Sequence, residues 1–66
     1  MTLFVNGESR QAADGATVAA LLADLGLAGK PVAVEVNLEL VPAAQHAARR
    51  LAEGDRVEIV PLDGGG

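Results

Sequence analysis

The sequence contains no cysteine, no tryptophan and no tyrosine, and phenylalanine occurs once. The lack of cysteine excludes disulfide bonds, thiolate metal sites, iron–sulfur clusters held by cysteine and a cysteine nucleophile. Because aromatic side chains are almost absent, a core must be built from Val, Leu, Ile and Ala, and apolar residues make up 50% of the chain. At 66 residues, the chain is expected to form one small domain with an aliphatic core.

Long apolar runs and basic clusters are also missing. No stretch approaches the roughly 18 apolar residues that a membrane-spanning helix needs, and the first ten residues lack the basic start and apolar run of a signal peptide. Nine acidic residues outnumber five basic ones, so no basic stripe is available to bind nucleic-acid phosphates. We therefore expect a cytoplasmic protein with no nucleic-acid or membrane partner. The net charge of −4 either keeps the domain in solution or suits a basic protein partner.

The first half of the sequence predicts a β-hairpin followed by a helix. The apolar run TLFV is followed by Asn6-Gly7, which is typical of a type I′ turn because both central residues must take positive φ. Residues 8–12 would then form the returning strand. Thr17 is a good N-cap, and Gly26 fits the left-handed position that ends a helix. Between them, apolar residues at i, i+3, i+4 and i+7 form one stripe of an amphipathic helix: Val18, Leu21, Leu22 and Leu25.

The second half of the sequence predicts mainly strands. VAVEVN at 32–37 is expected to be a half-buried strand with its three valines on one face. Residues 40–42 are expected to form a short strand that its proline ends or moves to an edge. Residues 43–51 have modest helical character. After a turn at 53–55, RVEIV at 56–60 alternates as a last strand with its Val and Ile inward.

One helix packed across one mixed sheet buries every apolar face with the fewest elements. We therefore predict an α+β fold of the ubiquitin-like β-grasp type, with four to five strands and one main helix. By analogy with β-grasp folds, the last strand would pair parallel to the first in the centre of the sheet. The domain would comprise residues 1–61, followed by a flexible C-terminal tail at 62–66.

Few residues offer catalytic or metal-binding chemistry. His46 is the only histidine, and neither a cysteine nor a second histidine accompanies it, so a surface or capping role is the favoured interpretation. The carboxylates are scattered over turns and outward strand positions instead of being paired for acid–base work. Phe4 and Val60, if both lie on the outer face of the sheet, would form a possible docking surface. The sequence therefore predicts no catalytic residue and no metal site of its own.

The glycine-rich end, PLDGGG, is the remaining candidate site. Its last five residues can extend about 16–18 Å, and glycines without a Cβ could pass through a narrow channel in a partner. A carboxylate is a poor acyl donor until ATP adenylates it, after which a sulfur nucleophile can displace AMP and leave a thiocarboxylate. By itself, a glycine run is equally compatible with an inert, disordered end. The predicted channel segment consists of Leu62, Asp63, Gly64 and Gly65, and the predicted acyl site is Gly66.

Over its whole length the sequence resembles the sulfur carrier proteins of thiamin biosynthesis, the ThiS family. The resemblance is carried by VNG at 5–7, TVAALLADLGL at 17–27, VAVEVNLELVP at 32–42 and LAEGDRVEIV at 51–60, followed by the terminal GGG. It implies a carrier that is not an enzyme and binds no cofactor. Its Gly66 would be adenylated by an E1-like, ATP-using adenylyltransferase and converted to a thiocarboxylate. The sulfur would come from a donor such as a cysteine desulfurase, and thiazole synthase would receive it.

The chain departs from the family pattern at three positions. Family members often have Arg after the proline and an aromatic residue three positions later, where this sequence has Ala43 and His46. A hydrophobic residue commonly precedes the glycines, where this sequence has Asp63. An unpaired buried charge is costly, so either a partner cation meets Asp63, or the tail docks differently, or the set of partners differs. Two alternatives stay open: a carrier of another pathway, such as the small subunit of molybdopterin synthase, and a β-grasp protein-binding module with an inert tail.

Overall fold

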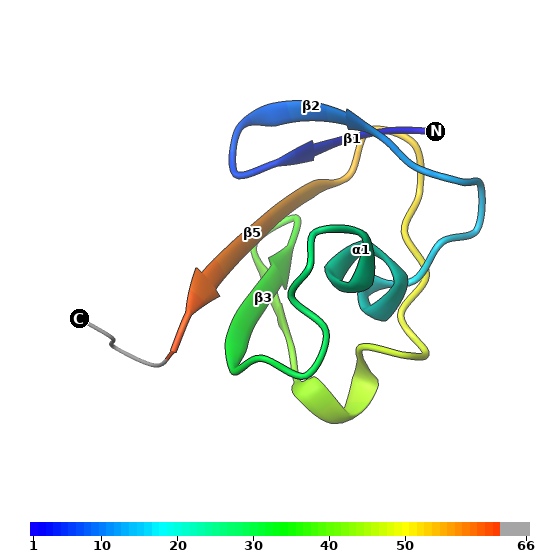
Figure 1. Ribbon diagram of the computed structural model, residues 1–66. Coiled ribbons are helices and arrows are strands. Elements are labelled where there is room, and N and C mark those ends of the chain that lie inside the picture. The colour runs from blue at the N-terminus through cyan, green and yellow to red at the C-terminus, as the bar shows by residue number, and fades with distance from the viewer. Residues whose placement is uncertain (63–66) are drawn as a thin grey trace.

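Strands from both halves of the chain meet in one mixed sheet in the computed structural model, which describes residues 1–62 (Figure 1). Within that range the order across the sheet is β2-β1-β5-β3-β4, with β1 and β5 parallel and the other neighbours antiparallel. The predicted central, parallel position of the last strand is therefore confirmed. The strands are β1 (Thr2–Val5), β2 (Glu8–Gln11), β3 (Val32–Val36), β4 (Glu39–Val41) and β5 (Arg56–Pro61).

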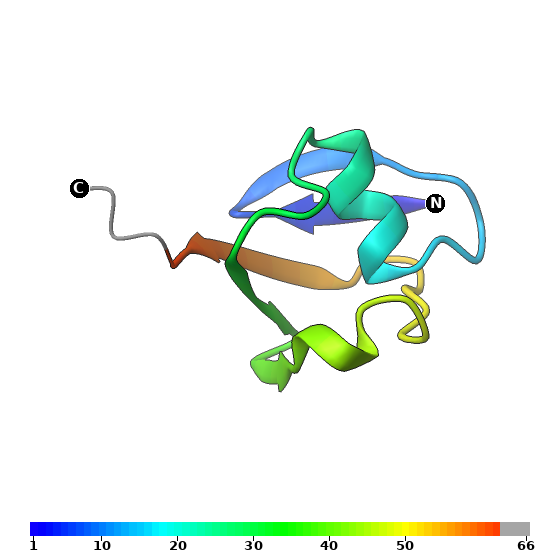
Figure 2. The ribbon, with the colours of Figure 1, turned by 60° about the horizontal axis from the view of Figure 1, so that its bottom comes forward.

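The helix α1 (Val18–Asp24) lies across one face of this sheet (Figure 2). Thr17 caps it as predicted, because its Oγ1 accepts a hydrogen bond from the backbone N–H of Ala20 at 3.1 Å. Gly26 takes the expected left-handed conformation, with φ of 75°. A short 3₁₀ helix, η1 (Ala43–Gln45), follows β4 within the segment of modest helical character. In the part of the chain described, no helix is long and apolar enough to cross a membrane.

The core lies between α1 and the inner face of the sheet. Three residues of the predicted helical stripe are buried, and Leu25 packs against them in a partly buried position. Within residues 1–62 no polar or charged side chain is buried, so aliphatic packing supplies the main stabilisation of the domain. The buried residues are Leu3, Val18, Leu21, Leu22, Val32, Val34, Val36, Val41, Leu51, Val57 and Ile59.

The β3–β4 connection differs from the sequence-based prediction. The strand was expected to continue through Asn37, but β3 ends at Val36 and β4 begins at Glu39. Asn37 and Leu38 form a two-residue loop with φ of 51° and 70°. Asparagine tolerates the left-handed region better than most residues. The alternation of apolar and polar residues continued through this turn, so it did not show where the strand ended.

Replacing Thr17 with alanine is expected to lower the free energy of unfolding by about 1 kcal/mol, which corresponds to about 4–8 °C in Tm for a domain of this size. The substitution leaves the backbone N–H of Ala20 without its acceptor but keeps the backbone bond from Val18 to the carbonyl oxygen of Arg49. Thermal denaturation followed by circular dichroism measures the change. Thr17→Ser keeps the hydroxyl and is the control. Equal Tm values for Thr17→Ala and the unsubstituted chain would contradict the capping role.

Candidate functional site

β5 carries the chain from the middle of the sheet toward the candidate tail. The strand ends at Pro61, which lies in register with Val32 on β3. The backbone N–H of Leu62 donates to the carbonyl oxygen of Pro31 at 2.9 Å, and the Leu62 side chain is 62% exposed. The backbone of Leu62 is therefore still hydrogen-bonded to the residue that precedes β3. The rest of the predicted site, Asp63, Gly64, Gly65 and Gly66, lies outside the described residues.

The side chain of Asn6 holds β5 shortly before that strand ends. Its Oδ1 accepts a hydrogen bond from the backbone N–H of Ile59 at 2.8 Å, and its Nδ2 donates to the carbonyl oxygen of the same residue at 3.2 Å. The backbone N–H of Asn6 also donates to Val57 O at 2.8 Å. The carboxamide thus continues the β1–β5 ladder beyond the end of β1. From the sequence, Asn6 was interpreted only as a turn residue, because nothing local reveals a contact 53 positions away.

Asn37 has the corresponding role at the beginning of β5. Its Oδ1 accepts from the backbone N–H of Arg56 at 3.0 Å, and its Nδ2 donates to Asp55 Oδ1 at 2.9 Å. Asp55 in turn accepts from the backbone N–H of Ala52 at 2.8 Å through Oδ2. Both ends of β5 are therefore fixed by an asparagine in a positive-φ turn, which keeps the strand that leads to the tail in one register.

The outer face of the sheet, away from α1, carries both residues of the predicted docking surface. Phe4 is half-buried and lies in register with Arg56, whose guanidinium carbon is 5.0 Å from the ring centroid, within the range of a cation–π interaction. Val60 is 55% exposed and in register with Ala33. Along β5 on this face, Glu58 stands between Arg56 and Val60. Phe4 and Val60 therefore share a face but are separated by charged residues, and their role in docking stays a prediction.

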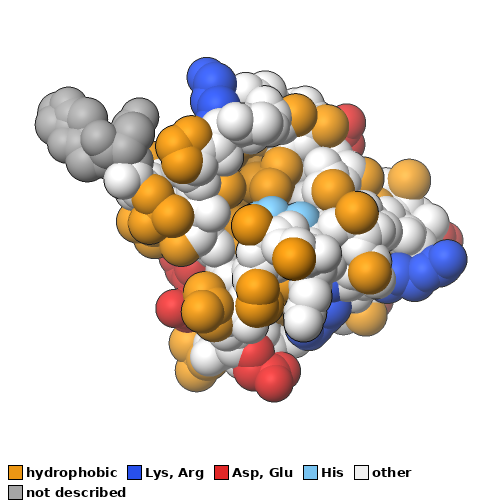
Figure 3. Space-filling view, turned by 90° about the horizontal axis from the view of Figure 1, so that it is seen from below, with side chains coloured by type: hydrophobic (Ala, Val, Ile, Leu, Met, Phe, Trp, Pro, Cys, Tyr) orange, Lys and Arg blue, Asp and Glu red, His pale blue; other side chains and the backbone are white. Residues whose placement is uncertain are grey.

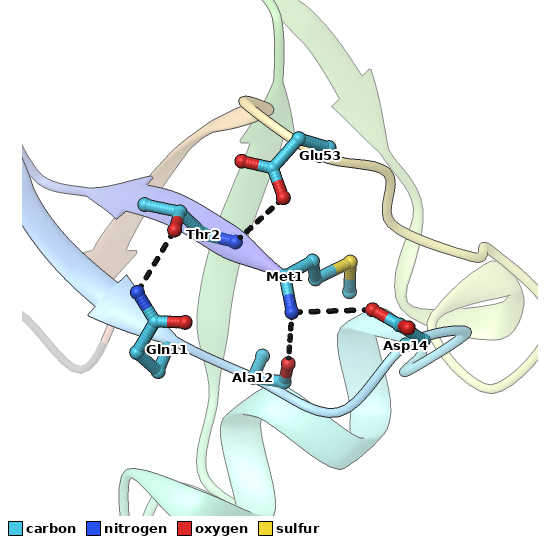
Figure 4. Close-up of polar contacts among 6 residues, drawn as sticks. All are labelled: Met1, Thr2, Gln11, Ala12, Asp14 and Glu53. Atoms are coloured by element: carbon cyan, nitrogen blue, oxygen red, sulfur yellow. Dashed lines mark hydrogen bonds and ion pairs between the residues drawn. The ribbon is translucent and has the colours of Figure 1, made fainter.

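Carboxylates at the N-terminal end of β1 bind main-chain nitrogen atoms (Figure 4). The amino group of Met1 donates to Ala12 O at 2.7 Å and lies 3.2 Å from Asp14 Oδ1. Glu53 Oε1 accepts from the backbone N–H of Thr2 at 3.0 Å. These contacts join β1 to the loops that precede α1 and β5. Across residues 1–62, no cluster of three or more His, Asp or Glu residues is placed to hold a metal ion.

Two open hollows border the end of β5. The larger, of about 840 Å³, lies between the β1–β2 hairpin and the loop after α1 and includes the cations of Arg10 and Lys30. The smaller, of about 570 Å³, includes Leu62 and His46, and the histidine is visible among apolar side chains in Figure 3. His46 Nε2 lies 2.9 Å from the carbonyl oxygen of Val41. This contact links the segment after β4 to the end of that strand.

Comparison with known proteins gives matches over nearly the whole chain. The sequence profile of the ThiS family matches residues 3–66. A thiazole synthase from Paramagnetospirillum magneticum is 47% identical over 66 residues, and one from Magnetococcus marinus is 41% identical over the same length. Each alignment covers 100% of this chain but 20% of the relative. The chain thus spans about one fifth of the length of these curated relatives.

Solved structures match the fold described above. The crystal structure of the thiamine biosynthesis protein ThiS from Geobacter metallireducens superimposes with a TM-score of 0.84 at 35% identity, covering 100% of both chains. The solution structure of a thiamine biosynthesis protein from the same organism gives a TM-score of 0.80 at 35% identity, covering 100% of this chain and 88% of the other. The predicted ubiquitin-like β-grasp fold is thereby confirmed. On the family match over residues 3–66 and this structural agreement, the chain belongs to the ThiS family.

Proposed function

We propose that this chain is a sulfur carrier in the synthesis of the thiazole half of thiamin, and that it is a co-substrate of other enzymes without catalytic activity of its own. The observation that carries the proposal is the full-length match to a ThiS thiamine biosynthesis protein, with 35% identity and a TM-score of 0.84. The two thiazole synthases that contain a counterpart of the whole chain support the same pathway.

The proposed reaction takes place at the carboxylate of Gly66. An E1-like adenylyltransferase binds ATP together with the tail. The carboxylate attacks the α-phosphorus of ATP, pyrophosphate leaves, and an acyl adenylate is formed. A sulfur nucleophile at the oxidation level of sulfide then attacks the acyl carbon and expels AMP, which forms the thiocarboxylate. A donor such as a cysteine desulfurase that delivers a persulfide also requires a thiol to reduce the resulting acyl disulfide. Thiazole synthase finally receives the sulfur.

The described part of the chain supports this proposal by fixing the origin of the tail. β5 is the central strand, both its neighbours pair with it, and Asn6 and Asn37 hold its two ends. An extended segment of five residues beyond Pro61 reaches about 16–18 Å. A rigid origin reduces the entropy lost when a partner takes up the tail. Leu62, Asp63, Gly64 and Gly65 are the proposed channel segment, in which Asp63 would meet a partner cation.

Incubation with an adenylyltransferase, ATP and a sulfur donor is expected to replace one oxygen of the chain by sulfur. Intact-mass spectrometry measures the mass gain, and fragmentation places it on Gly66. Omission of ATP is the control, because the carboxylate must be activated before sulfur can replace oxygen. An unchanged mass, with an adenylyltransferase shown to be active on another carrier, would contradict the proposed function and favour a binding module with an inert tail.

A further inference from the structure

Two β-hairpins in the described part of the chain are closed by the same kind of turn but by different residues. In each, a two-residue loop with positive φ at both positions joins antiparallel strands, as in type I′ turns. The first loop is Asn6-Gly7, with φ of 49° and 84°, and the second is Asn37-Leu38, with φ of 51° and 70°. Glycine takes the second position without steric cost, whereas leucine has a Cβ that opposes it. The second turn is therefore strained at Leu38, whereas the first turn, which has Gly7 at the same position, is not.

Leu38 gains nothing inside the described fold in return for this strain. Its side chain is 90% exposed, which is the largest exposure among the large apolar residues of the described chain, and it does not belong to the core cluster. Leu40, two residues further along, is 66% exposed. An apolar side chain that is both strained and exposed is costly to the free domain. Strain of this kind concentrates where a residue serves binding.

Three acidic residues lie near the two leucines, whereas the guanidinium of Arg56, whose backbone pairs with the turn at Asn37, lies over the Phe4 ring. Leu40 lies in register with Glu35, which lies in register with Glu58 on the neighbouring strand, and Glu39 separates the two leucines in the sequence. All three carboxylates are exposed. We call Leu38 and Leu40 with these carboxylates the hairpin-tip patch. Its charge opposes contact between two copies of the chain, each with a net charge of −4, and suits a surface lined with Lys or Arg.

The hairpin-tip patch and the last residue of β5 lie at opposite ends of the sheet. Val36, next to the patch, is in register with Val57 near the beginning of β5, whereas Val32 is in register with Pro61 at its end. A partner that contacts the patch while it holds the tail must span the length of β5. Binding energy from such a remote contact can position a reacting group without taking part in the chemistry.

We propose that the hairpin-tip patch docks on thiazole synthase, in an apolar pocket bordered by basic residues, with Leu38 as its anchor. This docking rests on the proposed function. The choice of partner is supported by the two relatives in which a segment equivalent to the whole chain is part of a thiazole synthase. Docking would offset the strain at Leu38, because burial of its side chain is favourable only in the complex.

The test compares Leu38→Gly with the unsubstituted 66-residue chain by calorimetric titration against purified thiazole synthase. The expected result is a Kd about 10- to 100-fold weaker, with a Tm that is unchanged or higher by up to about 5 °C because the strain is relieved. Leu38→Asn, which keeps the left-handed turn without the apolar group, should weaken binding similarly. Leu38→Met should retain most of the affinity.

A second comparison tests the charge of the patch. Glu39 and Glu8 each follow the second residue of a turn on an edge strand. Glu39→Lys places a positive charge opposite the basic residues proposed to border the pocket. It should weaken binding several-fold, and the effect should shrink at high salt because salt screens the charges. Glu8→Lys makes the same charge change at the other edge of the sheet and should leave the affinity within about twofold.

Each remaining outcome overturns either the docking or the proposed function. A Kd unchanged in Leu38→Gly, or no binding of the unsubstituted chain to thiazole synthase, overturns the docking. A dimer of the free chain in analytical ultracentrifugation that Leu38→Gly dissolves assigns the patch to a second copy and also overturns it. If the unsubstituted chain binds through Leu38 but gains no sulfur in the mass assay, the docking stands and the proposed function fails.

Discussion

Removal of Gly66 is expected to abolish thiocarboxylate formation while the domain remains folded. Each extended residue contributes about 3.3–3.6 Å of reach, so the carboxylate of the shortened chain would stop about one residue short of the adenylating centre. A displacement of only about 1 Å from the reacting geometry can cost about 100-fold in rate, and we expect at least that loss. Intact-mass spectrometry after incubation with adenylyltransferase, ATP and sulfur donor measures the product.

The fold should not change, because all the buried residues found within 1–62 precede Pro61. Equal Tm values for the shortened and the unsubstituted chain would confirm this, and a shortened chain that unfolds would show that the end of the chain is part of the domain. Restoring the length with a different residue, as in Gly66→Ala, is the matched control. It should recover part of the activity, because the reach is kept and only a methyl group is added.

Substitution of Asn6 by alanine is expected to lower the free energy of unfolding by about 2–3 kcal/mol. Two backbone groups of Ile59 lose their partner, and alanine must take the positive φ of 49° that asparagine tolerates. For a domain of this size the whole stability is only about 3–10 kcal/mol. The substitution therefore removes a large share of it. Urea denaturation gives the change, and hydrogen exchange of the Ile59 amide locates it.

Two matched variants separate the two causes of the lost stability, which are the missing hydrogen bonds to Ile59 and the unfavourable φ of alanine. Asn6→Gly removes the carboxamide but keeps the turn, so it should lose only the part due to Ile59. Asn37→Ala acts on the same kind of turn at the other end of β5, where the carboxamide holds Arg56. This variant should destabilise the domain without a selective increase in the hydrogen-exchange rate of the Ile59 amide. If the Ile59 amide exchanges at the same rate in Asn6→Ala and Asn37→Ala, Asn6 has no special role near the end of β5.

Local signals in the sequence predicted most of the fold. Asn6-Gly7, the cap at Thr17 and the helical stripe each act over a few residues, and the structure shows all of them where they were expected. The parallel pairing of β1 with β5 was inferred by analogy alone and is also confirmed. The extent of β3 was wrong by one residue, because Asn37 continues the alternation although it belongs to the turn.

The contacts that prepare the candidate site were not predictable in the same way. The bonds from Asn6 to Ile59 and from Asn37 to Arg56 join residues far apart in the sequence. The strain at Leu38 was also hidden, because leucine is neither a turn residue nor unusual beside a strand. The glycine end could be proposed as a site for the opposite reason, because the chemistry proposed for it depends on the glycine residues themselves and not on neighbours that the fold brings close.

The placement of β5 at the centre of the sheet also determines when the chain can fold. Asn6 and Ile59, which bond across the β1–β5 junction, are 53 positions apart, so everything between them must be synthesised before the two strands can meet. Long-range closure of this kind slows folding relative to a helical domain of equal length. A polypeptide truncated before β5 would contain the two hairpins and the helix, but it would lack the strand that joins the hairpins into one sheet. Such fragments would be targets for proteolysis, so completion of β5 decides whether any folded protein accumulates.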